Sequence, residues 1–279
     1  MAAAKISGAG IGLRLPHAHE VLAQPDCVAP WFELLVDNWL VEGGLNLRML
    51  DAIAERYPLV LHGVGLSLGG AKPIDFDYLR AIKSLKQRSG AVWYSEHACF
   101  CSDGSVQVPD LLPMPYTQEA VSYMAARIKQ VQDVLGERIL LENVSTYLAY
   151  PDNEMSEGQF LSALAGEADC ELLLDINNAY VTCQNLDQSL PQLLSDIDPD
   201  RVKQIHLAGF EDKGDYLLDA HNHPVAEPVW QAFSAYIHQH GVVPSMIEWD
   251  SDLPSLSRLL QERQQAEDLM QTIQHRVAS

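Results

Sequence analysis

Eight short apolar runs recur along the 279 residues of this chain, and longer amphipathic segments separate them. Apolar runs that alternate with helical patterns are typical of parallel strands in βα units. Eight such units predict an α/β fold, a single (β/α)8 TIM barrel, whose chemistry gathers at the C-terminal ends of the strands. The runs are Ile11–Leu15, Trp31–Asn38, Leu59–Leu66, Val92–Phe100, Ile139–Val144, Glu171–Val181, Val202–Phe210 and Pro244–Asp250.

Amphipathic periodicity predicts helices between these runs. Gly136 and Gly241 stand where two of the helices should end. The pattern over Leu253–Ile273 predicts a long final helix at about residues 253–275. Since no Pro-, Gly- or Ser-rich linker divides the chain, we expect one domain over residues 1–279. The clearest other helical segments are Asp75–Arg88, Thr117–Gly136, Glu157–Glu167 and Pro228–His240.

Charge and cysteine content narrow the range of partners and compartments. The chain has 18 Lys and Arg against 38 Asp and Glu, a formal net charge of −20, which opposes binding to a phosphate backbone. We therefore expect no nucleic-acid partner. No run approaches the roughly 20 apolar residues of a membrane span, so we expect no membrane partner. Five cysteines without a CxxC motif or a disulfide-framework pattern favour a reducing cytoplasm.

Six of the eight runs carry a His, Asp or Glu at or near the downstream end. Glu142 follows apolar residues in the stretch ILLENVS, and an ionised carboxylate is costly to bury without a partner. Asp175 and Glu248 repeat this arrangement. Arg14 is the one basic residue near a strand end, and it cannot neutralise three carboxylates. The sequence therefore predicts a metal site, with candidate ligands His62, His97, Glu142, Asp175, His206 and Glu248.

Two connections that follow His-bearing strands are longer than a barrel needs. They cover Cys101–Tyr116 and Glu211–Val225, and long loops on this face of a barrel usually carry function. The second connection adds Asp219 and His221 as candidate ligands, with His223 a weaker one.

The number and type of these candidates limit the metal. A single zinc ion needs three or four ligands, so eight His and carboxylate ligands suit two or three first-row ions. Nitrogen and oxygen ligands with open positions suit non-haem iron, manganese or zinc, and the ligand types do not choose among them. Side chains two apart on a strand face the same way, so Asn177 should share a face with Asp175.

Other classes of protein fit the same pattern. A metal-dependent sugar isomerase or an abasic-site endonuclease uses a similar barrel with His, Asp and Glu ligands. The acidic charge disfavours the endonuclease, and no lysine stands out near a strand end for the isomerase. A non-catalytic metal-binding protein is the third alternative.

In their order along the chain, the motifs resemble the multinuclear non-haem iron-dependent oxidases related to the methanobactin-biosynthesis oxidase. The resemblance extends from about Gly8 to Leu260. The matching stretches are His62–Leu68, Ser95–Cys99, Asp110–Thr117, Leu140–Ser145, Leu172–Val181, His206–Gly209, Asp219–Val225 and Ile247–Glu248.

This resemblance implies a TIM-barrel enzyme that holds two or three iron ions in a mixed Fe(II)/Fe(III) state. It would use O2 as co-substrate and modify cysteine residues of a ribosomally made precursor peptide, which a partner protein helps to present. The iron ligands, which are also the catalytic residues, would be His62, His97, Glu142, Asp175, His206, Asp219, His221 and Glu248, with Asn177 as a further metal ligand.

Three residues depart from the pattern of that family. Phe210 stands where many members have His in the stretch HLAGH, and Trp249 stands where many have Arg after the final Glu. Asp37 replaces the Glu that is common before the asparagine after the second strand. The implied ligands are retained, so these departures bear on the choice of substrate and on the occupancy of a third iron site.

Overall fold

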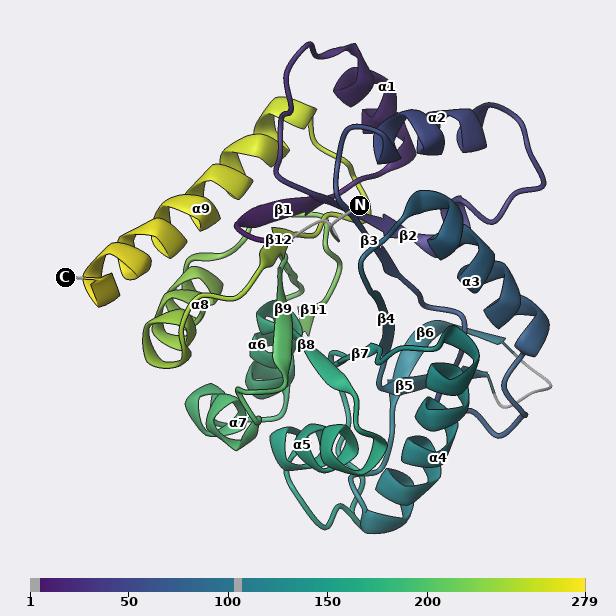
Figure 1. Ribbon diagram of the computed structural model, residues 1–279. Coiled ribbons are helices and arrows are strands. Elements are labelled where there is room, and N and C mark those ends of the chain that lie inside the picture. The colour runs from purple at the N-terminus through teal and green to yellow at the C-terminus, as the bar shows by residue number, and fades with distance from the viewer. Residues whose placement is uncertain (1–5, 103–106, 279) are drawn as a thin grey trace.

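The computed structural model describes residues 6–102 and 107–278. Eight parallel strands close into a barrel that helices surround (Figure 1), which confirms the predicted (β/α)8 fold. In their order around the barrel the strands are β1 (Ala9–Gly12), β12 (Ser245–Ile247), β9 (Val202–Leu207), β8 (Glu171–Asp175), β7 (Leu140–Glu142), β4 (Tyr94–His97), β3 (Leu59–His62) and β2 (Phe32–Leu35).

The helices follow the strands along the chain and cover the outside of the barrel (Figure 1). They are α1 (Leu15–Ala23), the 3-10 helix η1 (Val36–Asn38), α2 (Leu45–Ala54), α3 (Phe76–Ser89), α4 (Gln118–Leu135), α5 (Glu157–Ala168), α6 (Ile176–Asn185), α7 (Leu190–Asp196), α8 (Glu227–His240) and α9 (Leu256–Ala278). No helix in the described ranges is long and apolar enough to cross a membrane.

Each predicted apolar run overlaps a barrel strand, but the strands are shorter than the runs. The largest difference is at Glu171–Val181, where the strand ends at Asp175 and α6 begins at the next residue. The Asp175 carboxylate accepts a hydrogen bond from the backbone N–H of Asn178 and so caps the helix. Asn177 therefore lies in the first turn of α6, and the strand-alternation argument that placed it beside Asp175 is wrong.

The final helix also differs from its predicted bounds. It begins at Leu256 rather than at 253 and continues to Ala278 rather than ending at 275. Ser255 accepts a hydrogen bond from the backbone N–H of Arg258, as expected of a residue that caps the start of a helix.

Both long connections contain a short antiparallel hairpin. The first hairpin pairs β5 (Cys99–Ser102) with β6 (Gln107–Pro113), and the second pairs β10 (Glu211–Asp212) with β11 (Leu217–Leu218). Residues of both connections line the cavity described below, so the two insertions extend the C-terminal end of the barrel.

The interior of the barrel has two layers of different chemistry. Trp31, Val60 and Met246 are fully buried and form an apolar lower layer. A Cβ atom at Gly10 would lie 2.5 Å from the Trp31 ring, so only glycine leaves room for that indole. Two residues after Val60, His62 faces the same interior at the C-terminal end of its strand. The lower layer thus closes the barrel, and the polar layer above it faces the mouth.

Candidate metal centre

The C-terminal ends of the strands bring six polar side chains into the upper layer. Each residue lies at or directly after the end of a different strand, except that His206 precedes the last residue of β9. All are buried, with none more than 6% exposed. They are His62, His97, Glu142, Asp175, His206 and Glu248.

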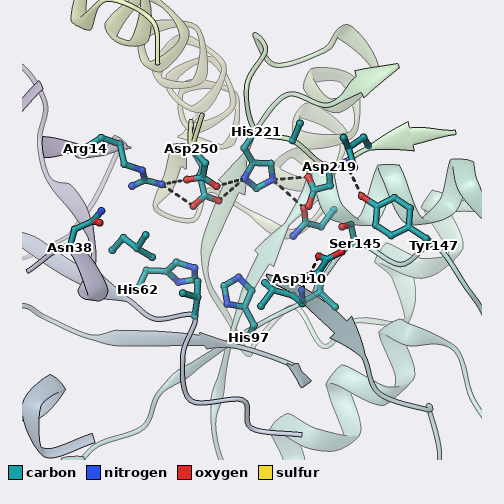
Figure 2. Close-up of a pocket in the computed structure, with 18 residues that line it drawn as sticks. Arg14, Asn38, His62, His97, Asp110, Ser145, Tyr147, Asp219, His221 and Asp250 are labelled. Atoms are coloured by element: carbon teal, nitrogen blue, oxygen red, sulfur yellow. Dashed lines mark hydrogen bonds and ion pairs between the residues drawn. The ribbon is translucent and has the colours of Figure 1, made fainter. Parts of the chain in front are cut away.

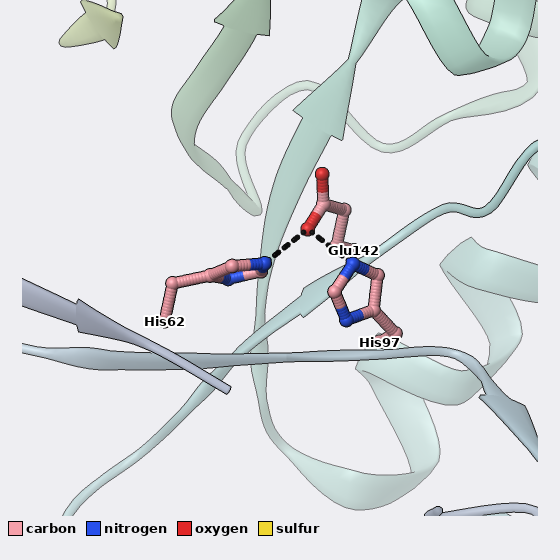
Figure 3. A group of neighbouring side chains, drawn as sticks. All are labelled: His62, His97 and Glu142. Carbon is pink, nitrogen blue, oxygen red and sulfur yellow. Dashed lines mark ion pairs between the residues drawn. The ribbon is translucent and has the colours of Figure 1, made fainter. Parts of the chain in front are cut away.

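The first group of donor atoms consists of two histidines and one carboxylate (Figure 3). The Nε2 atoms of His62 and His97 each lie 3.2 Å from Oε2 of Glu142. The donor atoms all lie within 4.8 Å of one another. Oε2 of Glu142 is buried, and no described residue donates a hydrogen bond to it. These three side chains converge as the ligands of one metal ion would.

The second group shares Glu142 with the first. Oε1 of Glu142 and Oε2 of Glu248 both lie 3.1 Å from Nδ1 of His206, and Asp175 completes the group. Nδ1 of His206 and Oδ2 of Asp175 are buried and have no hydrogen-bond partner among the described residues. Since unsatisfied buried polar atoms are rare, these atoms fit metal ligands. The two oxygens of Glu142 can therefore bridge two ions.

The third group places His221 between two sets of carboxylates (Figure 2). Its Nδ1 atom lies 3.3 Å from Oε2 of Glu248 and 3.1 Å from Oδ2 of Asp250, and these three residues form the group. Its Nε2 atom lies 2.7 Å from Oδ1 of Asp219. Asn177 donates a hydrogen bond of 2.7 Å to the same oxygen. A third ion could thus bind on the Nδ1 side of the ring, among His221, Glu248 and Asp250.

Asp219 and Asn177 lie outside the three groups but contact them through His221 and each other. Oδ1 of Asn177 is buried without a hydrogen-bond partner in the described part of the chain, so it could serve as a further oxygen donor. His223 is different, because it is hydrogen-bonded to its neighbour Asn222 on the surface. That the nine predicted residues act as ligands stays a prediction, although the structure brings them into one connected cluster.

The histidines of the first group are held by their second ring nitrogen. Nδ1 of His62 lies 2.8 Å from Oγ of Ser95, and Nδ1 of His97 lies 3.0 Å from the carbonyl oxygen of Gly63. A histidine that ligates a metal usually donates its other N–H group to such an acceptor. In its neutral form each ring can therefore hold its proton on Nδ1, which leaves the lone pair of Nε2 directed at Glu142.

Negative charge dominates the cluster. Burial opposes the protonation of His206, but the carboxylates around it, Glu33 first, raise its pKa well above the ordinary value. Burial likewise opposes the protonation of His97, and Glu142 leads the charges that raise its pKa to about 9. Burial raises the pKa of Asp175 well above that of an ordinary aspartate. The metal-free site thus holds protons that a bound cation would displace.

Three charged residues of this region were not predicted as part of the site. Arg14 contacts Asp250 and lies 3.4 Å from Oε1 of Glu248, so it offsets part of the negative charge. Asp250 could have been found from the sequence, because it follows Glu248 by two positions. Glu33 could have been found as the one acid inside the apolar stretch WFELL, where it shares a strand face with Trp31.

A cavity of about 410 Å³ opens above the donor atoms (Figure 2). His62, His97, His221 and Glu248 form its floor, and Tyr147 is part of its wall. Asp175, Glu142 and His206 do not line it and so lie deeper. The cavity is at the lower end of the size range of small-molecule sites, so it can hold a cysteine side chain with its neighbouring backbone but not a folded peptide.

The three residues that depart from the family pattern lie outside the donor groups. Phe210 stacks on Tyr180, with ring centroids 5.4 Å apart. Trp249 packs in the apolar core. Asp37 accepts a hydrogen bond of 2.9 Å from the hydroxyl of Tyr78.

The family model of the RiPP precursor modification enzymes MbnB/TglH/ChrH, which act on ribosomally made peptides, matches residues 8–271. The chain belongs to this family. It is 47% identical to a UPF0276 protein of Acaryochloris marina over 97% of both chains. It is also 41% identical to a UPF0276 protein of Anaeromyxobacter sp., over 95% of this chain and 93% of the relative. The resemblance found in the motifs is thus confirmed, and this RiPP-family barrel has a buried cluster that could bind metal ions.

Solved structures with the same fold include sugar epimerases. A D-tagatose 3-epimerase-like protein matches with a TM-score of 0.62 at 12% identity, covering 97% of this chain and 100% of that one. D-allulose 3-epimerase from Methylomonas sp. matches with a TM-score of 0.58 at 16% identity, covering 99% of both chains. At these identities the likeness shows the TIM-barrel fold alone.

Proposed function

We propose that this RiPP-family enzyme is a multinuclear non-haem iron oxidase that uses O2 to modify cysteine residues of a ribosomally made precursor peptide. The observation that carries the proposal is the sharing of carboxylates. Glu142 belongs to two donor groups and Glu248 belongs to two, so the groups are joined into one cluster rather than separated into independent sites.

The types of donor atom support iron. His62, His97 and Glu142 are two histidines and one carboxylate, the combination that holds non-haem Fe(II) in many oxygenases and leaves positions open. The three groups, as far as the chain is described, contain no cysteine. Bound there as two or three ions in a mixed Fe(II)/Fe(III) state, iron would supply redox chemistry with O2 and a Lewis-acid site for a thiolate.

The protein residues divide the remaining work. Glu142 and Glu248 would fix the spacing between neighbouring ions. His62 and His97 line the cavity, so the open positions of their ion would face an entering side chain. Asp175 and His206 are fully buried, and this part of the cluster would stay shielded from water.

The shape of the mouth suits one extended peptide segment. The cavity has room for only a short peptide segment around the modified cysteine, so the rest of the precursor must cross the rim. There Tyr147 and Tyr216 form an edge-to-face pair with centroids 6.4 Å apart and remain partly exposed. We expect apolar peptide residues to contact this pair and a partner protein to present the precursor, because the pair offers only a small surface.

The test is metal analysis and O2 uptake by protein purified without oxygen. Two to three irons per chain, with O2 consumed only when a cysteine-containing precursor is added, would support the proposal. The same precursor with Ser in place of Cys should give no uptake. In H206A we expect iron and activity to be lost, whereas H238A, on the exposed face of α8, should keep both. One zinc per chain, or full activity in H206A, would overturn the proposal.

A further inference from the structure

Glu33 is a buried carboxylate that lies inside β2 rather than at its end. It is 1% exposed, and the three donor groups of the described residues do not include it. Its Oε2 atom lies 3.1 Å from Nε2 of His206. The other ring nitrogen, Nδ1, faces Glu142 and Glu248. Glu33 therefore contacts His206 from behind, opposite the candidate metal ligands.

A short hydrogen-bond network settles the roles of the atoms around Glu33. The indole N–H of Trp93 can only donate, and it donates to Oε1 of Gln204 at 2.6 Å. The Gln204 amide nitrogen is thereby the atom that points at Glu33, and it donates to Oε2 at 2.6 Å. Oε2 of Glu33 is thus an acceptor, and His206 Nε2 is directed at it as well. The Gln204 amide nitrogen also lies 2.8 Å from His206 Nε2. Because an amide nitrogen can only donate, a proton on Nε2 requires this nitrogen to donate to Glu33 alone.

The acceptor behind His206 differs from those behind the other two histidines of the first two groups. His62 donates to the Ser95 hydroxyl and His97 to the backbone carbonyl of Gly63, and both acceptors are neutral. Glu33 carries a full charge. A carboxylate that accepts from a ligating histidine fixes the tautomer of the ring and makes the ring a stronger donor to the metal.

We propose that Glu33 is a positioning residue for His206. It holds the proton on Nε2, keeps the lone pair of Nδ1 directed at the second donor group and strengthens the binding of the ion there. The inference rests on the proposed metal centre but not on iron or on O2 chemistry. Glu33 does not line the cavity, so it does not touch a substrate and is not a catalytic residue.

The test is anaerobic titration of metal-free protein with Fe(II) in competition with a chelator, and separately with Mn(II) followed by its EPR signal. E33Q keeps the shape of the side chain but removes the charge. We expect it to weaken binding of the tighter ion by about 10–100-fold, the usual effect of removing such a partner. S95A is the matched control, because it removes a neutral acceptor behind His62, and it should have a smaller effect. The reduction potential of iron-loaded E33Q should also rise.

A second variant, E33D, distinguishes the hydrogen bond to His206 from the effect of the negative charge alone. E33D retains the carboxylate but withdraws it from Nε2 of His206, so the proposal expects weaker binding in E33D as well. Wild-type affinity in E33D would mean that Glu33 acts only as a distant charge, and wild-type affinity in E33Q would exclude both roles. Either result, or a wild-type protein that binds neither ion, would overturn the inference. Mn(II) binding that depends on Glu33, without O2 uptake on any peptide, would instead refute the oxidase and leave the inference standing.

Discussion

The two sides of the donor cluster hold their histidines in different ways. On the β3–β4 side, both histidines donate to neutral acceptors. On the β9–β12 side, the ring nitrogen opposite the donor group faces a carboxylate in both histidines: Nε2 of His206 faces Glu33, and Nε2 of His221 faces Asp219. A histidine that donates to a carboxylate is a stronger metal ligand than a histidine that donates to a neutral acceptor. We therefore expect the two sides to bind their ions unequally.

This asymmetry agrees with the position of the cavity. The β3–β4 histidines line it together with His221 and Glu248, whereas His206 is completely buried and does not line it. The ligands on the β3–β4 side would bring little negative charge to their ion, so one of its ligand positions could be taken by a substrate. An ion held by His206 in the second group would be enclosed by carboxylates, which would favour its higher oxidation state. We therefore expect an ion in the first group to exchange its ligands with a substrate and an ion in the second group to stay bound.

The largest effect on both sides should come from removing Glu142, the residue that they share. Because Glu142 contacts His62, His97 and His206, E142A should lose metal from both sides at once. Activity should fall by more than the 10–100-fold typical of residues that act behind a ligand. Iron analysis and O2 uptake measure the two effects. If E142A kept one full side of the cluster, the shared carboxylate would not be a bridge.

At low pH both sides should lose their metal ions, because protons compete with the metal for the histidine nitrogens. The pKa of metal-free His97 is raised to about 9, and those of His206 and His221 are raised well above the ordinary value. Histidine must be neutral to ligate, so affinity for Fe(II) should fall steadily as the pH drops below about 9. Binding at pH 7 should release protons, which titration in a weakly buffered solution detects. Affinity that is constant between pH 6 and 9 would contradict the assignment of these histidines as ligands.

Asp250 allows a smaller change that affects the β12 side alone. Its carboxylate contacts His221 and Arg14, and its backbone N–H donates 2.8 Å to the carbonyl of His221, whose φ of 45° lies in the left-handed region. D250N keeps this backbone contact but removes a charged donor of the third group. It should therefore weaken the third ion by at least about tenfold, the lower end of the loss seen for a hydrogen-bonded partner of a ligand. D252N, a change of an exposed neighbour, is the matched control. Equal loss in both variants would assign the effect to general charge.

The barrel could be predicted because its signal is repeated eight times. Apolar runs define inward and outward faces, and the C-terminal ends of parallel strands must meet at one end of a barrel. Strand ends are less visible, because an apolar run continues into the following turn. At Asp175 the cap of α6 ended the strand, and the chain then turned away from the alternation that had placed Asn177.

The partners behind the histidines could not be predicted in the same way. Glu33 acts on His206, which is 173 positions away, and their contact depends on how the barrel closes. The register pairs Glu33 with Gly12 on one side and Val60 on the other, and no local pattern specifies it. An acid within an apolar strand signals a buried partner but does not name it.

Glu157 is a buried carboxylate far from the cluster, and it shows what burial alone does to the pKa of a carboxyl group. Glu157 is 5% exposed at the start of α5, and its Oε2 atom has no hydrogen-bond partner among the described residues. Burial raises its pKa to about 8, so the folded state binds the proton more tightly than the unfolded state does. The stability contributed by this proton is complete below about pH 4.5 and is lost as the pH rises towards 8.

E157Q should therefore stabilise the metal-free protein at pH 8 and change little at pH 5. The gain in unfolding free energy near neutral pH is at most roughly 3 kcal/mol, since the N-terminus of α5 partly favours the ionised form. E167Q, an exposed change in the same helix, should have little effect at either pH. Thermal unfolding at both pH values measures this. A gain as large at pH 5 would show that Glu157 is not held protonated by burial, and the contrast with the carboxylates of the metal centre would be lost.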